Sequence, residues 1–202
     1  MWNGEHEVDR IIYELSETTC HPSRQKVFLE IGGGHPITLS NSYAFREKGW
    51  LVICVEPNPE LVSEFEKLGL QVLKYAAANR DIGEVDFYVS DQTMGMAYSS
   101  MGIRYGGSPK TKTIKAQALS METILQRHFP NLDQIDVVSV DCEGWEIEAL
   151  AGLDMNRRRP SIVVVENFAH LHEYADFMLR RKYSLAKIVG GYNYIFVPNA
   201  PS

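Results

Sequence analysis

The sequence lacks the features of a membrane protein, of an exported protein and of a disulfide-stapled protein. No apolar run approaches the roughly 18 residues that a transmembrane helix needs, and residues 1–7 lack the basic and apolar regions of a signal peptide. The cysteines, Cys20, Cys54 and Cys142, are too few and too scattered for a disulfide framework or a zinc site. We therefore expect a cytoplasmic protein with reduced thiols and no membrane span.

Acidic residues outnumber basic residues, which limits the kinds of partner. The chain carries 26 Asp and Glu against 20 Lys and Arg, a formal net charge of -6, whereas proteins that bind a phosphate backbone usually present a basic surface. We therefore expect no nucleic-acid partner. With 202 residues, 45% of them hydrophobic, the chain is long enough for one globular domain and too short for two. We expect a single domain over residues 1–202, with an N-terminal helix and connector over 1–25 and the core over 26–197.

Hydrophobic periodicity predicts an α/β chain in which strands and helices alternate. Helices are expected over residues 8–17, 37–48, 61–68, 121–129, 145–150 and 171–181. Strands are expected over residues 27–29, 51–55, 71–75, 85–90, 113–118, 135–140, 161–165, 183–189 and 192–197. The last two strands flank Gly190-Gly191, which predicts a hairpin and an antiparallel edge of the sheet.

A strand that runs into a glycine-rich turn is the most informative stretch of the chain. The apolar run Val27–Leu29 is followed by Glu30 and then by Gly32, Gly33 and Gly34. Glycines at such a turn can adopt positive φ and let the backbone approach a ligand closely. A helix that opens directly after the turn would add free N–H groups and its positive dipole end. The alternative is a turn with a purely structural role.

The spacing of these glycines separates two kinds of nucleotide cofactor. The dinucleotide fingerprint would place its third glycine at Ile37, where none is present, so NAD and FAD are disfavoured. The segment resembles instead the E-x-G-x-G loop of Rossmann-like S-adenosylmethionine (SAM) methyltransferases, which wraps the amino acid end of the cofactor. Glu30, Gly32 and Gly34 are the matching residues.

A second acidic residue, Glu56, closes the next predicted strand about 20 residues beyond the glycines. A carboxylate at this place in a βαβ unit can accept hydrogen bonds from both ribose hydroxyls, because it only accepts and a diol can donate twice. The alternative is an acidic residue near a helix start, since Pro57-Asn58-Pro59 follows. We favour the ribose role because of the glycine turn upstream.

Two further stretches are candidates for binding the cofactor and the substrate. Ala77 and Ala78 follow the third predicted strand, and their small side chains leave room either for a flat adenine ring or for a tight packing contact. Residues 91–112 show no periodicity, and a loop of this length in a compact domain is more often functional than idle. Tyr98 and Ser99 within it are expected to contact the substrate.

Acidic residues also follow the strands predicted over 135–140 and 161–165. Asp141 and Glu143 come after the first of these strands, and Glu166 comes directly after the second. Open α/β sheets bind ligands at the carboxyl ends of their strands. We therefore expect these side chains to line a ligand site.

Several motifs that occur in a fixed order give the chain a family resemblance. They are Glu30-x-Gly32-x-Gly34, Val55–Pro59, Ser120–Ile124, Val140–Gly144 and Val163–Asn167. With these motifs the chain resembles the FkbM family of SAM-dependent methyltransferases over residues 27–197. The strongest element is similar to the family's D-x-E-G-x-E segment and consists of Asp141, Glu143, Gly144 and Glu146.

This resemblance implies a fold, an activity and a set of cofactor contacts. The fold is a Rossmann-like α/β fold with a seven-stranded, mostly parallel sheet of order 3-2-1-4-5-7-6 and helices on both faces. The activity is O-methylation of a hydroxyl group on a small molecule, commonly a sugar or glycan. A SAM-binding module without catalysis and a methyltransferase of peptides are the alternatives. The cofactor contacts implied by the matching motifs come from Glu30, Gly32, Gly33, Gly34, Glu56, Pro57, Ala77, Ala78 and Asp141.

A hydroxyl acceptor is a poor nucleophile until its proton is being removed, so a general base is expected. Asp141 and His170 are preferred because both would project above the strand ends. The other candidates are Glu143, Glu166 and His172, of which His172 ranks last because a loop histidine is usually only solvated. Glu143 has an equally good structural explanation, since a helix dipole favours a carboxylate in the first turn. Asp141, Glu166 and His170 together would also suit a divalent metal ion that acidifies a hydroxyl.

Overall fold

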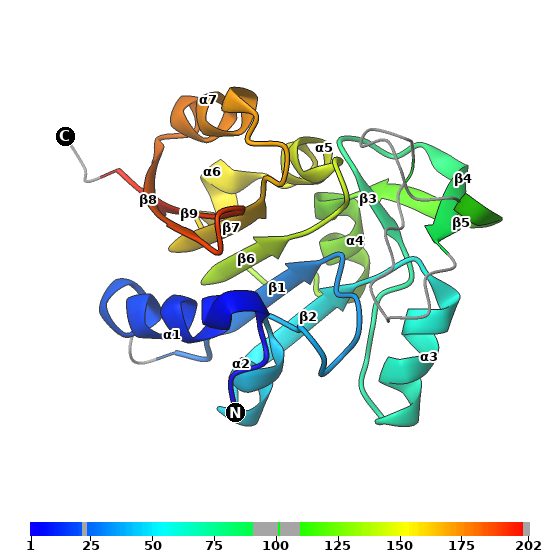
Figure 1. The fold of residues 1–202 in the computed structure, drawn as a ribbon, viewed down its shortest axis with the longest axis horizontal. Coiled ribbons are helices and arrows are strands. Elements are labelled where there is room, and N and C mark those ends of the chain that lie inside the picture. Colours follow the sequence, from blue (N-terminus) through cyan, green and yellow to red (C-terminus); the bar gives the residue numbers. More distant parts are fainter. Residues whose placement is uncertain (22–23, 91–100, 102–109, 200–202) are drawn as a thin grey trace.

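A mostly parallel sheet with helices on both faces forms the centre of the molecule (Figure 1). The computed structural model describes residues 1–21, 24–90, 101 and 110–199. The central sheet has 6 strands in the order β2-β1-β6-β7-β9-β8, and β9 runs antiparallel to both of its neighbours. These strands are β1 (Val27–Ile31), β2 (Leu51–Val55), β6 (Val137–Val140), β7 (Ile162–Glu166), β8 (Tyr183–Val189) and β9 (Asn193–Pro198).

A second, smaller sheet lies beside the first. Its 3 strands, in the order β3-β5-β4, are β3 (Ala76–Ala78), β4 (Gly83–Ser90) and β5 (Lys110–Ser120). The prediction of a single seven-stranded sheet was therefore wrong in strand count and order. Leu73, in the predicted third strand, makes a single bridge to Val55, and the backbone then turns, because the N–H of Tyr75 donates to the carbonyl of Leu73 at 3.0 Å. The mixed α/β class and the hairpin of β8 and β9 are confirmed.

Most of the predicted helices are present. The helices are η1 (Glu5–Glu7), α1 (Val8–Thr19), α2 (Tyr43–Glu47), α3 (Pro59–Lys67), α4 (Met121–His128), α5 (Glu146–Ala151), α6 (Met155–Arg158) and α7 (His172–Arg180). The longest, α1, has 12 residues. None of the helices in the described part of the chain combines the length and the apolar character of a membrane span.

The helix predicted over residues 37–48 was wrong for its first half, because α2 begins only at Tyr43. Polar side chains hold the preceding segment as a loop. The hydroxyl of Ser40 accepts hydrogen bonds from the N–H groups of Ser42 and Tyr43, at 3.3 and 3.1 Å. Leu39 adopts a positive φ of 60°, which a helix does not allow. The glycine turn is therefore not followed directly by a helix N-terminus.

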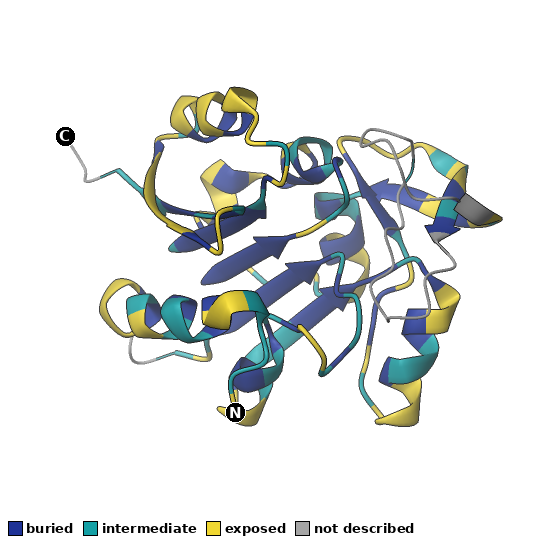
Figure 2. Cartoon of the chain, in the orientation of Figure 1, coloured by how far each residue is buried: buried dark blue, intermediate teal, exposed yellow. Residues whose placement is uncertain are grey.

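Side chains of β1 alternate between the two faces of the sheet. Leu29 belongs to the main core, together with residues of α4, α5 and α7. Phe28 points to the other face, where its ring packs against Phe45 of α2 with centroids 4.7 Å apart. Glu30 lies on the same face as Phe28, so its carboxylate is buried beneath the segment that leads into α2. Figure 2 shows the resulting arrangement, with buried central strands and exposed residues on the outer sides of the helices.

Candidate active site

The turn after β1 packs closely against neighbouring segments. Gly32 has a φ of +77°, and a Cβ atom on it would lie 1.7 Å from the carbonyl oxygen of Asp141. A Cβ atom on Gly33 would lie 2.0 Å from the Sγ atom of Cys54. The N–H groups of both glycines donate to the carbonyl of Val55, at 2.9 and 3.3 Å. Packing alone therefore excludes larger residues at these two positions.

Gly34 differs from the two glycines before it, because it borders open space. Its φ is +52°, and a Cβ atom there would meet no heavy atom within 4 Å. Its N–H group donates to Oε2 of Glu56 at 3.1 Å. The structure thus brings the glycine turn and the acidic end of β2 together, as expected, and leaves room beside Gly34 for a ligand.

Glu56 joins the glycine turn to the start of α3. Its side chain is 4% exposed, and Oε1 accepts a hydrogen bond from the N–H of Asn58 at 2.8 Å. Burial and, to a smaller extent, the charge of Glu30 raise its pKa from 4.5 to about 7. Each carboxylate oxygen accepts one bond from the protein and so keeps capacity for another donor. Glu56 is suited to accept bonds from a diol, and Pro57 lies next to it.

The buried side chain of Glu30 lies beneath the loop that follows the glycine turn. Its carboxylate accepts hydrogen bonds from the N–H of Asn41 at 3.1 Å and from the hydroxyl of Ser42 at 2.5 Å. Burial raises its pKa from 4.5 to about 7. Both oxygens hold the loop between the glycine turn and α2, which is a positioning role. Direct contact of Glu30 with a cofactor stays a prediction.

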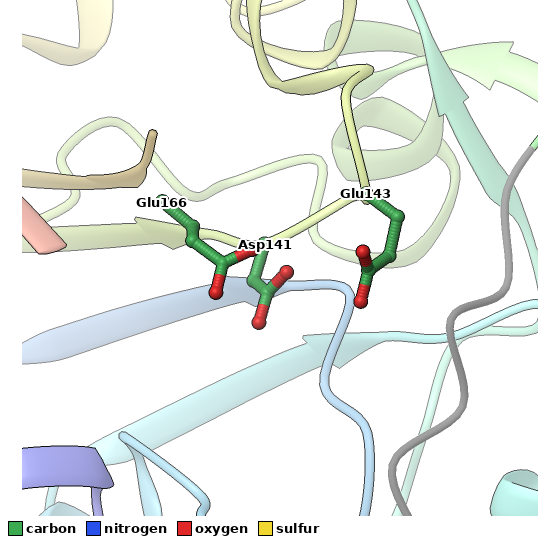
Figure 3. A group of neighbouring side chains, drawn as sticks. All are labelled: Asp141, Glu143 and Glu166. Atoms are coloured by element: carbon green, nitrogen blue, oxygen red, sulfur yellow. The ribbon is translucent and has the colours of Figure 1, made fainter. Parts of the chain in front are cut away.

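Three carboxylates converge at the ends of β6 and β7 (Figure 3). Asp141 follows β6, Glu143 lies in the loop to α5, and Glu166 ends β7. One carboxylate oxygen from each residue lies within 4.8 Å of the others. We call these residues the acidic cluster. The strands are neighbours in the parallel part of the sheet, which explains why the sequence predicted this meeting.

The members of the acidic cluster hold protons more tightly than ordinary carboxylates do. Desolvation, followed by repulsion between neighbouring negative charges, raises the pKa of Glu143 from 4.5 to about 9 and that of Glu166 from 4.5 to about 7. The pKa of Asp141 rises well above its usual range through desolvation and through Glu166. Asp141 is exposed, and its carboxyl group lies beside that of Glu166. A protonated Asp141 donates to Glu166, so the two carboxyls titrate as a pair.

The sequence motif contains Glu146 without indicating a role for it. The structure shows that this side chain is a hydrogen-bond acceptor for its surroundings. Its side chain is 1% exposed. One oxygen, Oε1, accepts hydrogen bonds from the N–H groups of Cys142 and Gly144, at 3.0 and 2.9 Å. The other oxygen accepts a bond from the hydroxyl of Tyr174 at 2.6 Å. These bonds flank Glu143, whose positive φ of 53° is strained for a residue with a side chain, and they hold it toward the cluster.

Other predicted site residues lie elsewhere. His170 is exposed, and its Nδ1 atom lies 3.2 Å from the hydroxyl oxygen of Tyr194. In the described part of the chain, the carboxylates that come together are those of the acidic cluster, so the metal set predicted from Asp141, Glu166 and His170 is not the set that the structure assembles.

The predicted adenine and substrate contacts are the remaining site residues. Ala77 and Ala78 are both buried, and Ala77 belongs to the main core. Their contact with adenine therefore stays a prediction beside an evident packing role. Tyr98 and Ser99 lie outside the described residues.

Comparison with models of protein families gives a match. The family model described as the methyltransferase FkbM domain matches residues 30–185. The matched range contains the glycine turn, Glu56, the acidic cluster and Glu146. No curated protein matches the chain.

Replacing Glu146 with alanine is expected to lower the free energy of unfolding by on the order of 2 to 4 kcal/mol, because two backbone N–H groups and the Tyr174 hydroxyl lose their acceptor. Urea denaturation measures this change. The control is Glu47→Ala at an exposed position of α2, where we expect a change within about 0.5 kcal/mol. An unfolding midpoint for Glu146→Ala equal to that of the wild type would contradict the assigned role.

The stability of the ligand-free protein is expected to fall as the pH rises from about 5 to 9. Glu30, Glu56, Glu143 and Glu166 have raised pKa values when folded, so the folded state binds more protons than the unfolded state above pH 4.5. Their stabilisation is complete below that pH and is lost as the pH passes through about 7 to 9. Urea midpoints across this range test the trend. Glu143→Gln should flatten the fall above pH 7 and Glu47→Gln should not, whereas stability that rises with pH would refute the explanation.

Proposed function

The chain belongs to the FkbM methyltransferase family, and from this premise we propose that it transfers a methyl group from SAM to a hydroxyl group of a sugar or glycan. The observation that carries the proposal is the meeting of three parts at one edge of the sheet. These parts are the open side of Gly34, the diol-accepting carboxylate of Glu56, and the proton-holding acidic cluster. A donor site and a proton acceptor are what methyl transfer to a hydroxyl requires.

The residues at the glycine turn fit an adenosyl cofactor. The space beside Gly34 admits a ligand close to the backbone, and Glu56 offers free acceptor positions for the two ribose hydroxyls. The backbone of Asp141 lies against Gly32, and the negative charge that Asp141 and Glu166 share when they hold one proton suits a sulfonium ion. When bound, SAM supplies an electrophilic methyl group.

The acidic cluster supplies the general base in this proposal. A hydroxyl that approaches the cluster can pass its proton to Asp141, and Glu166 stabilises the protonated form by accepting a hydrogen bond from it. The raised pKa of Asp141 makes it a stronger proton acceptor than an ordinary carboxylate. The third carboxylate, Glu143, is fixed by Glu146 and can accept a bond from a second hydroxyl of the acceptor. We place the base at Asp141 rather than at His170, which lies against Tyr194.

The direct test is methyl transfer from radiolabelled SAM to a panel of sugars, glycans and peptides, run beside calorimetric titration with SAM and S-adenosylhomocysteine. Label on a sugar or glycan supports the proposal. Label on peptides alone would show that the acceptor is a peptide and not a sugar or glycan. Binding of SAM with no transfer to any acceptor would favour a binding module, and a folded protein that binds neither compound would refute the proposed cofactor.

Replacing Glu56 with alanine is expected to weaken SAM binding by about tenfold or more, because the ribose hydroxyls lose a charged acceptor. Calorimetry measures the dissociation constant. The control is Glu60→Ala in the first turn of α3, where the side chain is 68% exposed, and we expect no change there. Equal SAM affinity in the Glu56 variant and the wild type would remove Glu56 from the cofactor site.

Replacing Asp141 with asparagine is expected to lower kcat by about 10²- to 10⁴-fold, because the amide cannot take the proton. The wild-type rate should rise with pH as Asp141, whose pKa lies well above its usual range, loses the proton that it shares with Glu166. A pH series of initial rates with a saturating acceptor checks both statements. A variant that keeps the wild-type rate and pH profile would show that the base lies elsewhere.

A further inference from the structure

Three segments that are far apart in the sequence meet beside the acidic cluster. The hydroxyl of Tyr192, in the turn between β8 and β9, donates a hydrogen bond to the carboxylate of Glu5 in η1. The carbonyl of Tyr192 accepts a bond from the N–H of Asn167, in the loop after β7, at 2.8 Å. Because Asn193 pairs with Glu166 in the sheet, the hairpin turn stands at the same edge as the acidic cluster.

These segments present a row of rings. The ring of Tyr192 contacts the ring of Phe168, with centroids 5.8 Å apart and planes inclined at 55°, and the ring of His6, with centroids 5.7 Å apart and planes inclined at 69°. We call Phe168, Tyr192 and His6 the aromatic shelf. Phe168 is 67% exposed, so most of its apolar surface faces solvent. A single exposed hydrophobic residue needs no explanation, but one that extends a row of rings next to a polar site offers a surface for a ligand.

The loop that carries Phe168 is held firmly. The buried side chain of Asn167 accepts a bond from the N–H of Leu171 at 2.9 Å and donates one to the carbonyl of the same residue at 3.1 Å. The N–H of His170 also donates to the carbonyl of Asn167 at 3.1 Å. Phe168 is therefore exposed on an ordered loop, in a fixed position relative to Glu166.

Electrostatic contacts place the aromatic shelf within reach of the acidic cluster. Burial raises the pKa of Tyr192, and the charges of Glu5, Glu166 and Asp141 raise it further. Glu5 also contributes to the raised pKa values of Asp141, Glu143 and Glu166. A molecule that lies on the shelf would thus have carboxylate oxygens along one edge.

We propose that the exposed ring of Phe168, supported by Tyr192, binds the acceptor by stacking against one face of its ring, while the acidic cluster accepts bonds from its hydroxyls. A pyranose has both features, because its C–H groups form an apolar face and its hydroxyls project from the rim. An acyclic polyol has the hydroxyls but no fixed face. This inference rests on the proposed methyltransferase function and adds that ring stacking selects the acceptor.

The test measures binding of methyl glucopyranoside, methyl galactopyranoside and methyl mannopyranoside, with sorbitol as the acyclic comparison, by saturation-transfer NMR. We expect the wild type to bind at least one pyranoside more tightly than sorbitol. Phe168→Ala should weaken that binding by about fivefold or more, and Phe168→Trp should retain it. The control is Leu179→Ala on α7, where the side chain is 60% exposed and the pyranoside affinity should not change.

Calorimetric titration with SAM distinguishes a failure of the stacking role from a failure of the proposed methyltransferase function. Phe168→Ala should bind SAM as the wild type does, which also shows that the variant is folded. The stacking role is overturned if Phe168→Ala binds the pyranoside with wild-type affinity, if sorbitol binds as tightly as the pyranosides, or if a wild type that binds SAM binds none of the pyranosides. Failure of the wild type to bind SAM would overturn the proposed function instead.

Discussion

Buried glutamates that accept hydrogen bonds from backbone N–H groups are the interaction on which the site depends. Glu30 holds the segment before α2, Glu56 holds Gly34 and Asn58, and Glu146 holds both sides of Glu143. Irregular loops at a sheet edge would otherwise leave these donors without partners. The same interaction therefore shapes the glycine turn and the acidic cluster. It also explains why so many carboxyl groups lie close together.

This arrangement costs stability, which the rest of the fold offsets. Removing carboxylates from water disfavours their charged forms, and their mutual repulsion adds to that cost. The strained backbone at Glu143 is a further cost. The buried strands and the two apolar layers around them supply the compensating free energy. A proton-rich cluster of this kind is useful because its carboxyls can exchange protons near neutral pH.

The sequence predicted those parts of the site that follow from the register of parallel strands. Carboxyl ends of neighbouring strands meet, so Gly34 and Glu56 come together, and so do Asp141 and Glu166. The sequence did not predict the late start of α2, because the hydroxyl of Ser40 competes with helical bonds only in the folded loop. The prediction of a single seven-stranded sheet was wrong because a short apolar run does not reveal which sheet its strand joins. No local sequence pattern predicts the hydrogen bond between Glu5 and Tyr192, because the two residues are far apart in the sequence.

That bond has a consequence for the order in which the site is completed during synthesis. The ribosome makes the chain from its N-terminus, and the two residues are 187 positions apart. The glycine turn and Glu56 therefore emerge well before Tyr192. A nascent polypeptide can therefore form the glycine turn while the aromatic shelf is still incomplete. The proposed acceptor surface is assembled only once the hairpin of β8 and β9 packs against η1.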